Sequence, residues 1–392
     1  MRRLLKWLVR LIGLLIVAIL VFVAFNWTMV RNIASAGGKS NAETAHLVAS
    51  QAVKGCGERP IPTASDDAFS RPTLNALQAF SDKHKGLGLI VMHDGKLVYE
   101  NYAKGVTAAT RMQSYSMNKS VTALMIGVAL ADSTLKSIDE PLGTVLREWQ
   151  GDDRKQITLR HLLTMSSGLR NPSMAKGEWA AMAMMLADNI EETALGIAAA
   201  KKPGTEFKYS NANPQLAGAV LRRALKDESY ADYLSRSLWC GVGNAPATLW
   251  AESEDGAPRF YAGLNANLRD WARIGQMVLD QGKVGDKQVV PAAWITAMTT
   301  PSSTNANYGF LTWLGSPADG TREYSPEAGI VAKHSAPYAA KGVIFFDGFG
   351  GQRVYIVPSA KLVIARIGET DMSFDDAPLV NLALSGMTAQ PK

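Results

Sequence analysis

The chain has 392 residues, of which 47% are hydrophobic and 19% charged, which suits one large or two moderate globular units with a proper core. Its formal net charge is +6, but five positive charges lie before residue 32, where no acidic residue occurs. The remainder is nearly neutral and has no basic stripe with interleaved aromatic residues, which argues against a nucleic-acid partner. Neither Cys-x-x-Cys nor His-Glu-x-x-His occurs, and we expect no metal site and no cofactor.

The N-terminal segment has the pattern of a membrane anchor. Four basic residues precede residues 11–25, which carry no charge, and the apolar character continues to residue 30. This length suits a helix that crosses a bilayer once. Because positive charge stays in the cytoplasm, we predict that residues 1–30 anchor the chain in the inner (cytoplasmic) membrane and that the body is periplasmic. A cleaved signal peptide, with Ala34-Ser35-Ala36 as its cleavage site, is the alternative reading.

The chain contains two cysteines, Cys56 and Cys240. In an exported protein they can form one disulfide, but two unpaired thiols are also compatible with the sequence. The sequence does not indicate an oligomeric state.

The remaining elements suggest an α+β fold. Residues 31–69 are small and polar and are expected to form a stalk, and residues 70–392 form the main domain. Asp94-Gly95 is a strong hairpin signal. Helices are predicted at 72–84, after residue 116, through most of 136–290 and at 377–384, and strands at 88–93, 96–102, 310–314, 342–346, 352–357 and 361–367. Strands at both ends with helices between them predict an antiparallel sheet flanked by helices, interrupted by a helical insert at about 136–290.

Ser116 and Lys119 form a Ser-x-x-Lys pair at the start of an apolar run, 121–130. Residues three apart on a helix share a face, so the lysine amine can reach the serine hydroxyl. A desolvated lysine with a lowered pKa can act as the base that a serine nucleophile needs. The same spacing recurs at Ser133 and at Ser173, but those two serines lie in polar, turn-like surroundings and are expected to be non-catalytic.

Two further motifs follow in the sequence. Tyr209 and Asn211 come after a Pro-Gly turn; the tyrosine can exchange protons between nucleophile and leaving group, and the asparagine can bind a substrate amide and the lysine. Gly348-Phe349-Gly350-Gly351-Gln352 leads into a predicted strand. Glycines there allow a close approach of substrate to the main chain, whose N–H groups can complete an oxyanion hole.

The order of these three motifs resembles that of the serine β-lactamase-related, penicillin-binding-protein-like hydrolase superfamily, which includes class C β-lactamases, esterases and 6-aminohexanoate-dimer hydrolases. The resemblance covers residues 70–386 and implies a β-lactamase/transpeptidase-like fold. It implies Ser116 as the acylated nucleophile, Lys119 as its base and Tyr209 as proton shuttle. Asn211 is then a contact of substrate and lysine, and the N–H groups of Ser116 and Gln352 bind the oxyanion.

One departure from the family pattern bears on the substrate. The family carries Lys-Thr-Gly or His-x-Gly on the strand where this sequence has Phe349-Gly350-Gly351. The lysine or histidine that would bind a substrate carboxylate is therefore missing. We therefore expect a membrane-anchored periplasmic serine hydrolase that cleaves small ester or amide substrates through an acyl-enzyme. The alternatives are a β-lactamase or D-Ala-D-Ala carboxypeptidase, and a non-catalytic binding or sensor protein of the penicillin-recognising type.

Overall fold

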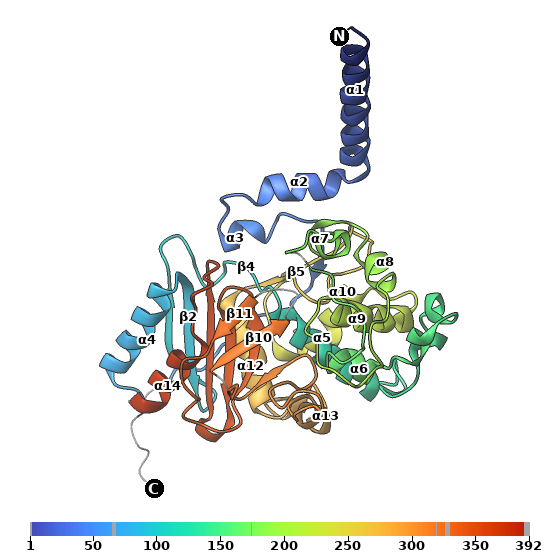
Figure 1. The fold of residues 1–392 in the computed structure, drawn as a ribbon. Helices are drawn as coiled ribbons and strands as arrows, with labels where there is room; N and C mark the ends of the chain where they lie inside the picture. The colour runs from blue at the N-terminus through green and yellow to red at the C-terminus, as the bar shows by residue number, and fades with distance from the viewer. Residues whose placement is uncertain (1, 65–67, 174, 319, 326–329, 388–392) are drawn as a thin grey trace.

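The structure is a computed structural model that describes residues 2–64, 68–173, 175–318, 320–325 and 330–387. It consists of a sheet covered by helices on both faces, joined to a largely helical part, with the N-terminal helix projecting from the body (Figure 1). This arrangement confirms the predicted α+β class.

The main sheet is antiparallel and has the strand order β3-β2-β14-β13-β12-β9. Its strands are β2 (Gly86–His93), β3 (Lys96–Tyr102), β9 (Trp313–Leu314), β12 (Ile344–Gly348), β13 (Gln352–Val357) and β14 (Leu362–Gly368). The helices α4 (Arg71–Lys83) and α14 (Asp376–Gly386) pack together beside the sheet, and α12 (Leu268–Leu279) packs on β2, β13 and β14. A Cβ at Gly275 of α12 would lie 2.7 Å from the Val354 side chain, so this glycine lets the helix approach the sheet closely.

The other part of the body holds a smaller sheet and most of the helices. The smaller sheet has the order β1-β5-β6-β4. Its strands are β1 (Ser50–Val53), β4 (Met112–Gln113), β5 (Ala247–Trp250) and β6 (Leu264–Ala266). The helices of this part are α5 (Met117–Ala131), α6 (Leu159–Leu163), α7 (Trp179–Leu186), α8 (Ile190–Leu195), α9 (Ala212–Leu225), α10 (Tyr230–Leu234), α11 (Cys240–Val242) and α13 (Ala292–Met298). Two hairpins complete the fold, formed by β7 (Lys283–Val284) with β8 (Lys287–Gln288) and by β10 (Thr321–Ser325) with β11 (Ile330–Lys333).

Helix α5 joins the two parts of the body. It contacts α9 of the helical part and β12 and β13 of the main sheet, and its residues from Met117 to Ala129 are all buried. A helix that is buried on every side needs apolar residues all round, which explains why its sequence lacks an amphipathic period. The predicted buried helix after Ser116 is therefore confirmed.

The segment 136–290 is less uniformly helical than predicted. It contributes β5 and β6, which pair with β1 and β4 from outside the segment. The strand expected at 310–314 is reduced to β9, because Leu311 adopts a left-handed conformation with φ 49°. The other predicted strands and the closing helix agree with the structure to within a few residues.

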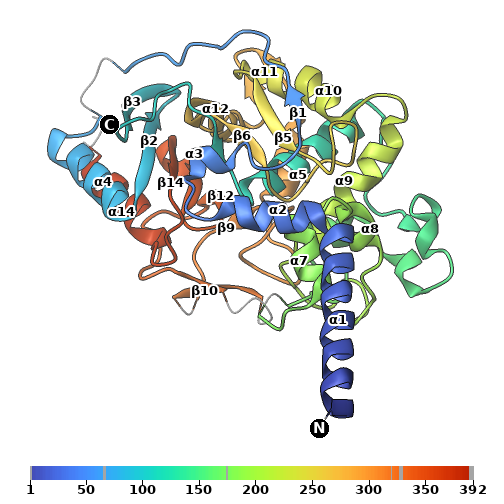
Figure 2. The same ribbon diagram turned by 90° about the horizontal axis from the view of Figure 1, so that it is seen from above.

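The region expected to be a stalk is instead folded onto the body. It forms most of α2 (Trp27–Ala36), α3 (Asn41–Thr44) and β1, and α2 lies across the body at the base of α1 (Figures 1 and 2). The buried Asn41 amide donates hydrogen bonds to the carbonyls of Gln113 and Gly368, both at 3.2 Å, and its oxygen accepts one from the Gln113 N–H at 2.6 Å. These contacts fix the lead-in to the strand that precedes Ser116.

Helix α1 (Arg2–Phe25) projects away from the body (Figure 1). Its window Lys6–Ala24 is long and apolar enough to cross a membrane and is not buried in the body, and an N-terminal signal sequence has the same properties.

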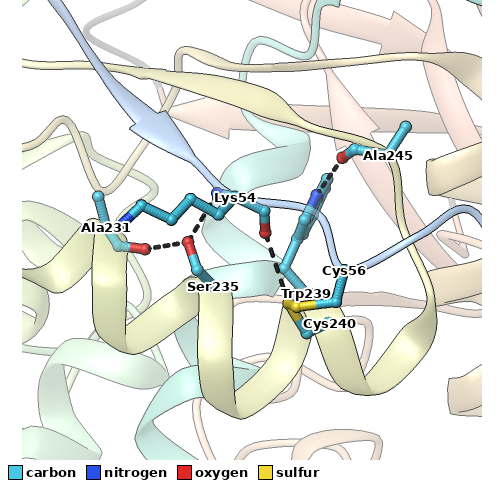
Figure 3. Close-up of a disulfide and its surroundings, with 7 residues drawn as sticks. All are labelled: Lys54, Cys56, Ala231, Ser235, Trp239, Cys240 and Ala245. Atoms are coloured by element: carbon cyan, nitrogen blue, oxygen red, sulfur yellow. Dashed lines mark hydrogen bonds between the residues drawn. A yellow bond between two sulfur atoms is a disulfide. The ribbon is translucent and has the colours of Figure 1, made fainter.

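The two cysteines form a disulfide that joins Cys56, in the segment after β1, to Cys240 at the start of α11 (Figure 3). Around it, the Lys54 N–H donates to Ser235 Oγ at 2.8 Å, and Trp239 Nε1 donates to the Ala245 carbonyl at 2.6 Å. The pairing decides between the two alternatives that the sequence left open, and it fits an oxidising compartment.

We predict that the disulfide makes a large contribution to stability. It closes a loop of 184 residues, for which the loss of chain entropy in the unfolded state corresponds to about 5 kcal/mol. Reduction should therefore lower the Tm of the full chain by about 5–10 °C, measured by calorimetry in detergent. The control is a Cys56→Ser/Cys240→Ser double variant, whose Tm should not respond to the reductant. Equal Tm values for oxidised and reduced wild-type protein would contradict the prediction.

Candidate active site

Ser116 is the N-cap residue of α5, and its side chain makes no capping hydrogen bond. Its hydroxyl is therefore not committed to the helix, while the positive end of the helix dipole lies at the same point. The preceding residue, Tyr115, has φ 48°, a left-handed conformation that bulky residues rarely adopt. The Tyr115 N–H donates to Gln113 Oε1 at 2.9 Å, which helps to hold this turn. The chain thus presents Ser116 at the end of a rigid helix, after a strained turn.

Lys119 lies one turn further along α5, and 1% of the residue is exposed. Its Nζ is 2.7 Å from Ser116 Oγ, 2.9 Å from Asn211 Oδ1 and 3.3 Å from the carbonyl oxygen of Tyr261. The structure therefore brings Ser116, Lys119 and Asn211 together. It also adds the Tyr261 carbonyl, which the motifs in the sequence did not reveal.

Burial lowers the pKa of Lys119 from 10.5 to about 7, and the negative charge of Asp347 opposes this shift. A substantial fraction of the amine is then neutral at neutral pH. A neutral amine has two N–H donors and one lone pair, whereas an ammonium group has three donors and no acceptor. The amine has three oxygen neighbours: in either form it can donate to Asn211 and to the Tyr261 carbonyl, and in the neutral form its lone pair can accept the proton of the Ser116 hydroxyl. This is the arrangement of a general base.

Tyr209 lies beside the amine. Its ring centroid is 4.8 Å from Lys119 Nζ, and its ring stacks on Trp313 at 5.6 Å and meets the Tyr324 ring at 5.2 Å. Its main-chain carbonyl accepts a hydrogen bond from Asn171 Nδ2 at 3.1 Å. The aromatic neighbours and this hydrogen bond hold the ring in one orientation.

The pKa of Tyr209 is raised well above 10, mainly by burial and further by Asp347, although its hydrogen bond with Ser116 lowers it. The phenol is therefore protonated at neutral pH and is not the resting base. The two shifts run in opposite directions, so that at neutral pH Lys119 can accept a proton and Tyr209 has one to donate.

The glycine motif forms the turn between β12 and β13. Gly350 and Gly351 have φ values of 73° and 96°, and a Cβ on them would meet Thr370 and Phe374 respectively, so both glycines shape the turn. Gln352 is fully buried, and its Oε1 accepts a hydrogen bond from the Gly368 N–H at 2.7 Å.

Gly348, the first glycine of the motif, lies against the segment that precedes Ser116. A Cβ on Gly348 would come within 2.5 Å of the Ser114 carbonyl oxygen. Beside it, Phe349 is 36% exposed, and its ring centroid is 6.0 Å from that of Tyr115. The end of β12 therefore passes alongside the turn that presents Ser116, and glycine is required there because a side chain would clash with the main chain.

A buried group of two arginines and two aspartates lies behind Tyr209. Arg322, from β10, donates to Asp347 at 2.9 Å and to Asp376 at 2.6 Å, and Arg353 donates to Asp376 at 2.7 Å and pairs with Asp347 at 2.5 Å. The four charges balance. Arg322 also lies over the Trp313 ring, 4.4 Å from its centroid, which links the group to the aromatic residues around Tyr209.

Arg322 of β10 and Arg353 of β13 are thus both paired with aspartates. Lys341, another cation near this part of the sequence, is exposed and precedes β12, at the end of the strand opposite to Gly348. Neither Arg353 nor Lys341 replaces the cation that the family pattern has at this place.

The other two Ser-x-x-Lys pairs have different surroundings. Ser133 and Lys136 are both exposed, and Ser173 Oγ accepts a hydrogen bond from the Lys176 N–H at 3.3 Å, as in an ordinary turn. Neither pair has a buried lysine. His161 accepts a hydrogen bond from the Thr158 N–H at the start of α6 and so has a structural role.

The model of the beta-lactamase family matches residues 74–381. The match spans most of the chain, and the chain therefore belongs to the beta-lactamase family.

Relatives of known name are distant. The 6-aminohexanoate-dimer hydrolase of Paenarthrobacter ureafaciens is 24% identical over 163 residues, which are 41% of this chain and 39% of the relative. Protein flp of Staphylococcus aureus is also 24% identical over 163 residues, 39% of this chain and 32% of the relative. The chain thus matches two fifths or less of the length of these relatives.

Solved structures confirm the β-lactamase/transpeptidase-like fold. A Bacillus anthracis protein provisionally named a 6-aminohexanoate-dimer hydrolase superimposes with a TM-score of 0.69 at 21% identity, covering 86% of this chain and 89% of that one. A class C beta-lactamase superimposes with a TM-score of 0.62 at 18% identity, covering 84% and 100% of the two chains.

We predict that Ser116→Ala abolishes covalent labelling by a fluorophosphonate probe, because this serine alone among the three Ser-x-x-Lys serines faces a buried amine. Ser133→Ala and Ser173→Ala serve as matched controls and should label at the wild-type rate. Labelling is read by in-gel fluorescence and the modified residue by peptide mass spectrometry. Loss of labelling in either control, or its survival in Ser116→Ala, would overturn the assignment of the nucleophile.

Proposed function

We propose that the chain is a membrane-anchored serine hydrolase that cleaves small ester or amide substrates through an acyl-enzyme on Ser116. The observation that carries the proposal is the buried Lys119 amine, 2.7 Å from Ser116 Oγ, with a pKa lowered to about 7. A protein that only binds a ligand has no need of a neutral base against a serine hydroxyl, which argues against the sensor alternative.

In the proposed acylation step, Lys119 accepts the Ser116 proton as Oγ attacks the substrate carbonyl carbon. Tyr209 then donates its proton to the leaving oxygen or nitrogen as the bond to the carbonyl carbon breaks, and the proton on Lys119 restores the phenol. Because the pKa of Tyr209 is raised, the phenol keeps its proton until the bond to the leaving group breaks and the leaving atom becomes basic enough to accept it. Water attacks the acyl-enzyme by the same route in reverse, which releases the acid and regenerates Ser116.

The tetrahedral intermediate needs donors for its oxyanion. The Ser116 N–H is one, because it lies at the start of α5, where N–H groups have no partner within the helix. For the second donor we propose the Phe349 N–H in place of the Gln352 N–H that the resemblance implied. Phe349 follows Gly348, which lies against Ser114, and is partly exposed, whereas Gln352 is fully buried.

The charges near the site favour a substrate without a carboxylate beside the scissile bond. Phe349 offers an apolar ring next to Tyr115, and the neighbouring Arg322 and Arg353 are paired with aspartates. The name of one relative, 6-aminohexanoate-dimer hydrolase, adds linear amides to the substrates to be tested. Helix α1 and the disulfide support a chain held in the inner membrane with its body in the periplasm.

We predict that neutral acyl esters or amides are hydrolysed faster than analogues with a carboxylate next to the scissile bond. A charge-assisted contact is worth about 1.5–3 kcal/mol, so its absence should give a gap in kcat/KM on the order of tenfold or more. The measurement is steady-state kinetics on matched p-nitrophenyl ester pairs.

Two variants test the cause of this preference. Phe349→Lys should narrow the gap, because it adds a cation beside the nucleophile, whereas Phe349→Leu preserves the apolar surface and should keep the gap. A wild-type preference for the carboxylate substrates would contradict the proposal and favour the carboxypeptidase or β-lactamase alternative.

A further inference from the structure

The predicted anchor and the body are in direct contact. The ring of Phe22, in α1, lies 5.9 Å from the ring of Trp179, the first residue of α7, in an edge-to-face arrangement. Thr28 Oγ1 donates to Asp188 Oδ2 at 2.7 Å, and Met29 of α2 is buried. The anchor therefore meets the body through a packed junction.

This junction fixes the depth of α7 relative to a bilayer that holds α1. The apolar window ends at Ala24, and Phe22 lies two residues before it, about 3 Å inside the end of the span. Exposed tryptophans stand at both ends of the window, Trp7 and Trp27. Helix α1 rises about 27 Å from Trp7 to Phe25, and Trp27 follows at the turn into α2, so the two tryptophans stand near the two interfaces where tryptophan concentrates. A side chain that touches Phe22 therefore lies at or just below the headgroup level, and Trp179 does so.

The outer side of α7 carries an apolar stripe that continues from this contact. Trp179, Met182 and Met185 are spaced by three residues and so share one helix face. Trp179 is 40% exposed and Met185 is 46% exposed, and Met182 is partly exposed. Within α7 (Trp179–Leu186) no residue is charged. Such a stripe is costly in water but is stabilised by lipid.

Helix α2 supplies the polar part of the same surface. It lies across the body beside α7, between α1 and the remainder of the fold (Figures 1 and 2). Trp27 and Arg31 are four residues apart on α2 and both are exposed. Tryptophan with arginine on one face suits the boundary between acyl chains and anionic headgroups.

We propose that the α2–α7 face, made up of Trp27, Arg31, Trp179, Met182 and Met185, docks on the periplasmic leaflet of the membrane that holds α1. The partner is an anionic phospholipid surface. The proposal rests on the anchoring part of the proposed function, and it goes beyond that part because it fixes the face that the body turns to the lipid.

The test uses a single introduced thiol, which is unique because both native cysteines are in the disulfide. Met185→Cys, labelled with the fluorophore NBD, is reconstituted as the full chain in vesicles of phosphatidylethanolamine and phosphatidylglycerol that contain a phospholipid spin-labelled near its headgroup. Ala293→Cys, exposed on α13 at the far side of the body, is the matched control (Figure 1). We expect the spin label to quench the Met185→Cys probe severalfold more than the control probe.

Equal, weak quenching at both positions would overturn the proposal, and Met182→Cys provides a second position on the stripe if Met185→Cys fails to fold. Two readouts on the same vesicles separate this outcome from a failure of the proposed function. Resistance to carbonate extraction reports whether α1 anchors the chain. Fluorophosphonate labelling reports whether Ser116 is active. It also reports whether α7 is folded, because the α7 carbonyls of Met184 and Met185 accept hydrogen bonds from Tyr261 and Arg259, which lie next to the site.

Discussion

The chemistry of the proposed site depends on the burial of one amine. Lys119 sits in a helix whose first thirteen residues are all buried, and removal from water disfavours its charged form. One pKa unit corresponds to about 1.4 kcal/mol, so the shift of Lys119 represents several kcal/mol of differential stabilisation of the neutral amine. The fold provides this by placing α5 between the main sheet and the helical part, where every side of the helix is covered.

The negative charge of Asp347 works against this effect, because it raises the pKa of Lys119. Arg322 and Arg353 pair with Asp347 and bring Asp376 into the same buried group, so that the net charge behind Tyr209 is zero. Removal of one member of such a group would leave an unpaired buried charge, at a cost of about 3–5 kcal/mol. The group also joins the β10–β11 hairpin to the end of β12, the strand that passes Ser116. The ion pairs that neutralise Asp347 therefore also hold this part of the site in place.

The sequence predicted those features that depend on local spacing. Ser116 and Lys119 are three residues apart, Asp94-Gly95 closes a hairpin, and apolar runs locate most helices. The features that it missed depend on contacts between distant residues. Asn41 binds groups 72 and 327 residues away, and these contacts turned an expected stalk into part of the body. The aspartates that pair with Arg322 lie 25 and 54 residues further along the sequence. The Tyr261 carbonyl that contacts Lys119 lies 142 residues from it in the sequence.

A carbonyl has no signature in a sequence, since every residue carries one, and the Tyr261 contact could not have been read from residue types. Gly348 belongs to the glycine motif of the sequence, but the contact that requires a glycine there could not be predicted, for a related reason. It stands next to the conspicuous glycines of the turn, but its requirement for glycine comes from the Ser114 carbonyl on another element. The disulfide, by contrast, was one of two possibilities named from composition, and the geometry of the fold decided between them.

The central claim is that the neutral Lys119 amine activates Ser116, and the most direct test is the pH dependence of the second-order rate constant for fluorophosphonate labelling. The amine is the base only when deprotonated, so the rate should rise with pH through a midpoint near 7. Asn211→Asp places a carboxylate where an amide oxygen lies 2.9 Å from Nζ, and it should move the midpoint upward by about 1–3 units. A wild-type rate that is flat between pH 6 and 9, or a midpoint unmoved in Asn211→Asp, would contradict the account.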